Sequence, residues 1–218
     1  MHTPRFNAFN QIHKAYRTLM FDTVMQLQHS DFGNPESCRA AIDQTSLLLE
    51  LMDDHAHHED TFILHAAESK APDLIHEFES EHVTDLALSN QLREKIAAYW
   101  QAEDKALAGK EIYYALNAFV AFNLQHMNKE ELVLNPVLWQ HYSDQELLGI
   151  VQNIQRSISP EKMNIAAEWM IKGLANTELI PWLKAVQAEA PAPAYEALLA
   201  ATRQHLPAAR WAFVEKQL

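Results

Sequence analysis

The chain has 218 residues, enough to bury the core of one domain or of a domain with an extension, and its 4 glycines are so few that an all-α protein is favoured. Its 17 basic and 29 acidic side chains give a net charge of -12, so nucleic acid and acidic membranes would repel it. One cysteine excludes an intrachain disulfide, and no apolar run is long enough to span a bilayer, so we expect a cytoplasmic protein.

Helix start and stop signals predict four long helices. Asn34 is placed to cap the second helix and Pro35 to begin it, Pro72 opens the third, and Gly109 is expected to separate the third from the fourth. The helices are expected over residues 6–28, 35–69, 72–104 and 110–142. Long helices of matched length joined by short turns predict an up-and-down four-helix bundle over residues 1–142.

After residue 142 the pattern changes to short helical pieces. Ser143 and Glu146 have the spacing of a capping box, and prolines then divide the chain into four or five short helices. Apolar side chains give this part a face that must be covered. We expect residues 143–218 to form a helical C-terminal extension docked on the bundle, where it limits solvent access; self-association as a homodimer is the alternative that the sequence leaves open.

Two pairs, His55 with Glu59 and His126 with Glu130, share the spacing His-x-x-x-Glu. Residues four apart lie one above the other on the same face of a helix. Both pairs fall within apolar stripes with helical spacing, where core residues are expected. The stripes are Leu48, Leu51, Met52, Phe62 and Ala66 in the second helix, and Leu116, Phe119, Asn123, Leu134 and Val137 in the fourth.

The other two long helices each place one further histidine inward. His13 lies on a stripe of the first helix and His82 on a stripe of the third, whereas His57 and His76 fall on faces expected to meet solvent. The stripes are Phe6, Phe9, Tyr16 and Met20 in the first helix, and Phe78, Leu86, Ser89, Leu92 and Ile96 in the third. Each of the four helices therefore points one imidazole at the bundle axis.

Burying two carboxylates without partners would cost several kcal/mol each, a large part of a total stability of roughly 5–15 kcal/mol. Imidazolium–carboxylate pairs could neutralise them as a structural polar layer. Bound divalent metal could also do so, and two ions bridged by Glu59 and Glu130 would share the six donors comfortably. This donor set favours two iron ions, with manganese or zinc as alternatives. Because only neutral imidazole ligates, metal affinity is expected to fall below about pH 6.

The ordered set of these motifs over residues 5–142 resembles the hemerythrin-like (HHE cation-binding) domain. The motifs that carry the resemblance are Ile12-His13-Lys14-Ala15, His55-x-x-x-Glu59, Glu81-His82 and His126-x-x-x-Glu130-Glu131. The resemblance implies that His13 and His55 ligate one iron and that His82 and His126 ligate the other. It also implies that Glu59 and Glu130 bridge the ions together with an oxo or hydroxo group.

One position departs from the oxygen-carrying members of that family, which have His-x-x-x-His in the third helix. Phe78 stands four residues before His82. The second metal is therefore expected to lack one imidazole, whose place could be taken by water, by Glu79 or Glu81, or by another neighbour. A simple reversible oxygen store is less expected for such a site than a sensor, an iron-handling protein or a redox-active centre.

Two function classes follow from the resemblance. The first is a non-enzymatic protein that binds or senses dioxygen, nitric oxide or iron in redox or iron stress. The second is a di-iron oxidoreductase acting on peroxide or nitric oxide, and the sequence favours the first without deciding between them. A small diatomic ligand such as dioxygen or nitric oxide is the expected partner, and neither nucleic acid nor a membrane is expected to be involved. A metal-free scaffold is the third interpretation.

Overall fold

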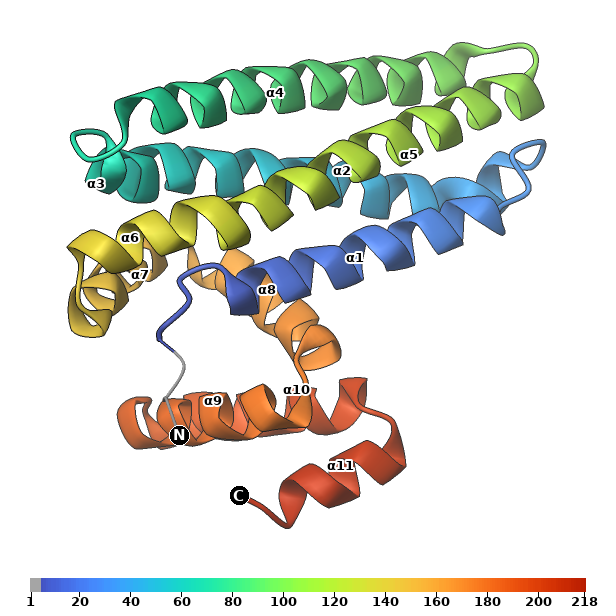
Figure 1. Ribbon diagram of the computed structural model, residues 1–218. Coiled ribbons are helices and arrows are strands. Elements are labelled where there is room, and N and C mark those ends of the chain that lie inside the picture. Colours follow the sequence, from blue (N-terminus) through green and yellow to red (C-terminus); the bar gives the residue numbers. More distant parts are fainter. Residues whose placement is uncertain (1–4) are drawn as a thin grey trace. The chain divides into compact units, whose positions relative to one another are not determined.

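The computed structural model describes residues 5–218, and all regular secondary structure in that range is helical (Figure 1). The α-helices are α1 (Asn10–Gln28), α2 (Pro35–His58), α3 (His65–Ala67), α4 (Pro72–Gln101), α5 (Lys105–Lys129), α6 (Asn135–His141), α7 (Asp144–Ser157), α8 (Pro160–Gly173), α9 (Asn176–Glu189), α10 (Ala192–His205) and α11 (Ala208–Glu215). Two π-helical segments, η1 (Glu59–Leu64) and η2 (Glu130–Leu134), join α2 to α3 and α5 to α6. The predicted all-α class is confirmed.

The chain packs as two compact units. The first contains Leu19–Ser157 and the described part of Met1–Phe9, and the second contains Asn10–Thr18 and Ile158–Leu218. Helix α7 thus packs with the helices that precede it, and the first half of α1 is counted with the C-terminal helices. The division into domains 1–142 and 143–218 stays a prediction, as does docking of the C-terminal extension on the bundle.

In the first unit, α2, α4, α5 and the second half of α1 lie along one another, and successive helices run in opposite directions (Figure 1). Side-chain hydrogen bonds join α1 to two of its neighbours. Gln26 Nε2 donates to Gln44 Oε1 of α2 at 3.0 Å, and Tyr113 Oη of α5 donates to Gln28 Oε1 at 3.0 Å. Among the described residues, no helix is long and apolar enough to cross a membrane.

The boundary between α4 and α5 differs from the predicted one. Gly109 lies inside α5, and the chain instead breaks after Gln101, where Asp104 caps α5 by accepting a hydrogen bond from the Leu107 amide at 2.9 Å. A Cβ atom placed on Gly109 would stand 2.1 Å from Cγ of Phe32. The glycine is therefore explained by the close approach of the α1–α2 turn to α5, which local sequence does not reveal.

We expect Gly109→Ala to destabilise the protein by about 1–3 kcal/mol, because its methyl group must displace the ring of Phe32. Gly149→Ala is the matched control, since Gly149 is also helical but has no atom within 4 Å of an added Cβ. That control should be neutral or more stable by about 0.5–1 kcal/mol. Urea unfolding of both variants measures the difference, and equal stabilities would contradict the close-packing explanation.

Both π segments begin at the glutamate of a His-x-x-x-Glu motif. A π turn holds one residue more than an α turn, so the buried face moves one residue along the chain. Ile63 and Ala67 are buried in place of Phe62 and Ala66, which are only half-buried. In the same way Leu138 is buried in place of Val137. These predictions were wrong because a regular 3.6-residue period was continued through a π turn.

The inward stripe predicted for the third long helix, which is α4 in the structure, was also partly wrong. Leu86 is 51% exposed, whereas its neighbour Asp85 is buried. His82, Ser89 and Leu92 are buried as predicted, and Ile96 is half-buried. An aspartate took the inward position because a hydrogen-bond donor from α5 meets it there, as described below.

An apolar cluster lies just beyond the two glutamates, at the end of the unit where α3 and α6 are found. We call it the end cluster; it consists of Phe9, Ile63, Leu64, Ala67, Ile75, Phe78, Leu134, Leu138 and Leu147. Phe78 and Leu134 are fully buried in it. Burial of these side chains anchors the segments that follow Glu59 and Glu130.

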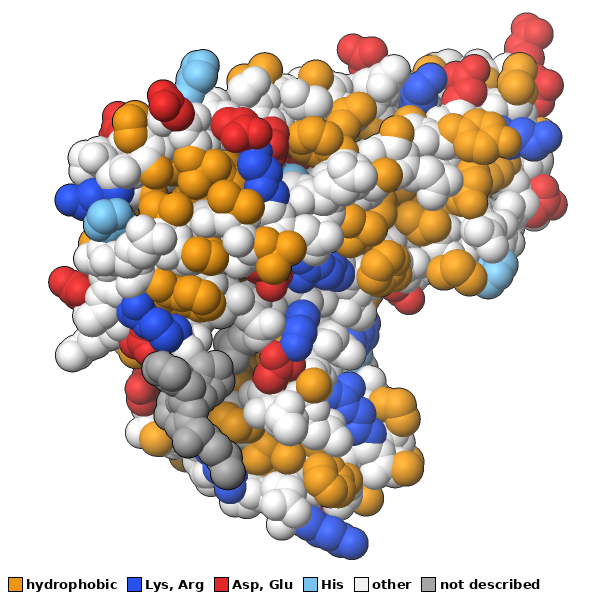
Figure 2. Space-filling model, viewed as in Figure 1, with side chains coloured by type: hydrophobic (Ala, Val, Ile, Leu, Met, Phe, Trp, Pro, Cys, Tyr) orange, Lys and Arg blue, Asp and Glu red, His pale blue; other side chains and the backbone are white. Residues whose placement is uncertain are grey.

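Short helices with a regular spacing follow α6. α7, α8, α9, α10 and α11 begin at residues 144, 160, 176, 192 and 208, a constant interval of 16 residues that was not predicted. α7 belongs to the first unit, and the other four helices belong to the second. The core of this unit is formed by Ile171, Leu174, Leu179, Leu183, Leu206 and Val214. Lys14 of α1 binds Glu178 of α9 with an Nζ–Oε1 distance of 2.5 Å. On the face drawn in Figure 2, acidic, basic and apolar side chains are interspersed.

Candidate metal centre

All of the predicted ligands are buried, with exposures from 0% to 9%. They are His13, His55, Glu59, His82, His126 and Glu130. His57 and His76, which were expected to face solvent, are exposed. The face assignments of these histidines are therefore confirmed, although their roles as ligands stay predictions.

The buried donors form two overlapping groups, in each of which potential ligand atoms lie within 4.8 Å of one another. One group is Glu59, His82, His126 and Glu130; the other is His13, His55, Glu59 and Glu130. Both groups contain the same two carboxylates. Each group thus offers two imidazoles of its own and shares both glutamates with the other.

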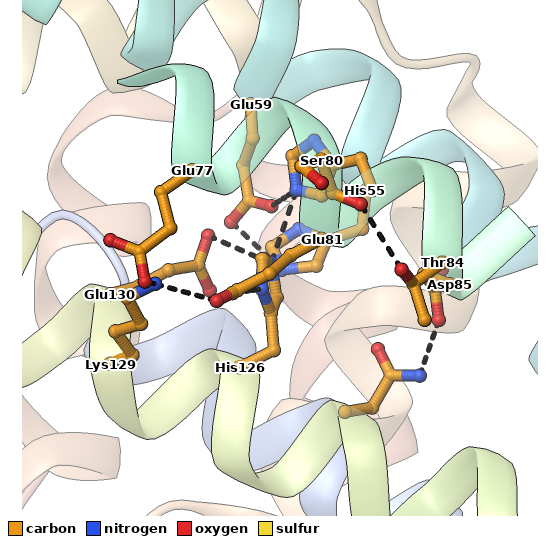
Figure 3. A network of polar contacts seen from close by, with 12 residues as sticks. His55, Glu59, Glu77, Ser80, Glu81, Thr84, Asp85, His126, Lys129 and Glu130 are labelled. Atoms are coloured by element: carbon orange, nitrogen blue, oxygen red, sulfur yellow. Dashed lines mark hydrogen bonds and ion pairs between the residues drawn. The ribbon is translucent and has the colours of Figure 1, made fainter. Parts of the chain in front are cut away.

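The imidazoles of His55 and His126 lie beside the carboxylates of Glu59 and Glu130 (Figure 3). His55 Nε2 lies 3.1 Å from Glu59 Oε1, and His126 Nε2 lies 3.4 Å from Glu130 Oε1. The Nε2 atoms of His82 and His126 are 3.1 Å apart. Two nitrogens each bound at about 2.1 Å to one ion would stand about 3.0–3.4 Å apart at angles near 90–109°, so this spacing fits adjacent ligands of a shared ion.

Carboxylates hold the opposite ring nitrogens of two of these histidines. Asp60 Oδ1 lies 2.7 Å from His82 Nδ1, and Glu81 Oε2 lies 2.7 Å from His126 Nδ1. When Nδ1–H donates to a carboxylate, Nε2 can be unprotonated and can bind a metal ion in the interior. Such carboxylates orient metal-binding imidazoles. Lys129 Nζ in turn donates to Glu81 Oε1 at 2.5 Å (Figure 3).

These orienting contacts were not predicted from the sequence. Asp60 was given no role, and Glu81 was considered only as a replacement ligand. A signal was present, because Asp60 follows Glu59 directly and Glu81 precedes His82 directly. The partner of each carboxylate lies on another helix, however, so sequence neighbours alone could not identify it.

The charges of the site raise the pKa values of the two imidazoles that face each other. Burial alone would lower the pKa of His82, but its hydrogen bond to Glu59 and the charge of Glu59 raise that pKa to about 9. For His126, burial is likewise outweighed by Glu130, and the pKa rises to about 10. At neutral pH the metal-free site therefore holds imidazolium groups, which must lose a proton before they can ligate.

The position of the missing third-helix imidazole is apolar. Phe78 is fully buried, and its ring packs edge-on against His126 with centroids 5.6 Å apart. Glu79 is exposed and pairs with His76, while Glu81 binds His126, so neither carboxylate joins the donor groups. Among the described residues, neither of the two acidic candidates considered takes the place of that imidazole.

Next to the site lies a buried polar pair that sequence reasoning missed. Asp85, one helical turn after His82, accepts a hydrogen bond of 2.5 Å from Asn123 Nδ2, and both side chains are buried (Figure 3). Burial raises the pKa of Asp85, although the bond from Asn123 opposes this rise. Asn123 was predicted inward, and the spacing of Asp85 from His82 was the signal that could have found its partner.

The fold and the donors together define an all-helical protein with clusters of histidine and glutamate suited to metal cations. The family model of the Hemerythrin HHE cation binding domain matches residues 6–138, more than half of the chain. The chain belongs to this hemerythrin family, as its motifs predicted. Comparisons with curated proteins and with solved structures found no match.

Proposed function

We propose that this protein binds two metal ions between the helices of an up-and-down four-helix bundle formed by α1, α2, α4 and α5 with their continuations. His13 and His55 would hold one ion, His82 and His126 the other, and Glu59 and Glu130 would bridge them. The single observation that carries the proposal is that the two buried donor groups share both glutamates. Two +2 ions would offset the buried negative charge.

The geometry favours metal over a purely structural polar layer. With raised pKa values, His82 and His126 would both carry a proton at neutral pH, although their Nε2 atoms stand only 3.1 Å apart. Two N–H groups facing each other at that distance repel, because neither can accept a hydrogen bond from the other. Replacing these protons by a cation removes the repulsion and retains the contacts to the glutamates.

Iron is the metal we propose, with manganese or zinc as the alternatives. A mixed set of imidazole and carboxylate donors suits all three ions, and iron adds redox chemistry and binding of diatomic ligands. We infer a cytoplasmic protein that binds or senses dioxygen, nitric oxide or iron. In this role the residues of the chain hold the ions, exclude bulk water and orient the imidazoles through Asp60 and Glu81.

A di-iron oxidoreductase acting on peroxide or nitric oxide is the second candidate. The observation that favours it is the apolar Phe78 in place of an imidazole, since the ion held by His82 and His126 then has fewer protein ligands. An ion with open positions can take a substrate as well as a ligand. A sensor should bind its ligand once, whereas an enzyme should turn over many times.

The test begins with protein purified without chelator. We expect elemental analysis to find two iron ions per chain and the loaded protein to absorb in the near-ultraviolet and visible range. Multiple turnovers with peroxide or nitric oxide would establish the enzymatic alternative. Protein that stays metal-free after incubation with iron, manganese and zinc would overturn the proposal.

A further inference from the structure

Asn135 is the one asparagine of the described chain whose buried side chain has neither polar atom hydrogen-bonded. Its exposure is 0%, and both Oδ1 and Nδ2 lack a hydrogen-bond partner among the described residues. Asn123, also buried, instead donates to Asp85. A buried carboxamide without partners is costly, so its presence calls for an explanation.

The position of Asn135 is fixed by the π segment that precedes it. Its backbone amide donates to the carbonyl oxygen of Glu130, five residues earlier, so Asn135 lies one π turn beyond Glu130 on the helix. Its neighbour Leu134 belongs to the end cluster together with Phe78. Asn135 is therefore a buried polar residue one π turn beyond Glu130, and the residue before it packs in the cluster that contains Phe78.

The other half of the site provides a direct comparison. Five residues after Glu59 stands Leu64, which is buried and belongs to the end cluster. A leucine is thus compatible with the equivalent position one π turn beyond a glutamate. At this position the two halves differ by one carboxamide, on the segment that carries Glu130.

We propose that Asn135 is a ligand-binding residue of the metal centre, whose Nδ2 donates a hydrogen bond to a small anion or oxygen-containing ligand bound to the ions. This inference rests on the proposed metal-binding function. An asparagine is suited to the role because its amide donates a hydrogen bond without adding a positive charge, which the metal ions would repel. A ligand that accepts this hydrogen bond satisfies the buried amide.

The experiment compares Asn135→Leu, Asn135→Asp and the wild-type chain, with azide as the anionic probe of the iron-loaded proteins. We expect Asn135→Leu to retain its iron and to bind azide at least tenfold more weakly. Asn135→Asp should bind azide more weakly still, because a carboxylate repels the anion. Unchanged azide affinity in both iron-loaded variants would overturn the inference.

Thermal unfolding of the metal-free proteins separates ligand binding from a structural role. Metal-free Asn135→Leu should unfold at the same temperature as wild type or higher, because the variant removes an unsatisfied buried amide. Asn123→Leu is the matched control and should lower the unfolding temperature, since it leaves Asp85 buried without its donor. A clear loss of stability in metal-free Asn135→Leu would show that the amide serves the fold, and would overturn the inference. Wild-type protein that binds no metal would instead defeat the proposed function.

Discussion

Glu130→Ala is expected to remove most of the metal from both positions. Glu130 is fully buried, and its carboxylate belongs to both donor groups, so one substitution takes a ligand from each ion. A histidine variant such as His82→Ala takes a donor from only one group and should lose mainly one ion. Elemental analysis after gel filtration measures the ions retained per chain.

The controls for this experiment are acidic and histidine residues outside the donor groups. Glu79→Ala, His57→Ala and His76→Ala should retain the wild-type metal content, because all three side chains are exposed. Glu59→Ala should match Glu130→Ala. If the control variants lost as much metal as the two glutamate variants, the assignment of ligands to the buried face would be wrong.

The second large effect is on pH dependence. As the pH rises, the stability of the metal-free protein should fall while the affinity of the protein for metal should increase. The pKa values of His82 and His126 are raised in the metal-free fold to about 9 and about 10. The stability that these imidazolium groups contribute is fully present below their unfolded pKa of about 6.5, and it is lost as the pH rises through 9 to 10. Metal-free protein should therefore become less stable between pH 7 and 10.

Metal binding should strengthen over the same range. Each imidazole must release a proton to ligate, so the apparent metal affinity should rise by up to about tenfold per pH unit for each proton displaced. The metal affinity should therefore begin to fall at a higher pH than the value of about 6 that was predicted for ordinary imidazole. Thermal unfolding of the metal-free protein and chelator competition between pH 6 and 10 measure the two trends. If stability and metal affinity changed with pH in the same direction, the raised pKa values would be contradicted.

Much of the site was predictable because helical periodicity determines which side chains share a face. His13, His55, His82 and His126 each fall on an apolar stripe, and the structure buries all four. The same periodicity separated His57 and His76 from them. Periodicity failed where the helix itself changes, since the π segments after Glu59 and Glu130 move the buried face by one residue.

Other features depend on partners from distant parts of the chain. The role of Gly109 follows from the ring of Phe32, and the inward position of Asp85 follows from Asn123 on the next helix. The orienting carboxylates Asp60 and Glu81 likewise act across helices. A homodimer, a cytoplasmic location and the choice between sensor and enzyme stay predictions.

The sequence by itself determined the helical class, the family and the six buried donors, because these depend on residue types and on spacings within single helices. Only the tertiary structure decided which donors come together, which carboxylates orient the imidazoles and where Asn135 is buried without a partner. The reason is physical: a helix sets which side chains share its own face, but contacts between helices depend on how those faces pack. The closeness of the donors is therefore a property of the packing, and the chemistry proposed for them depends on it.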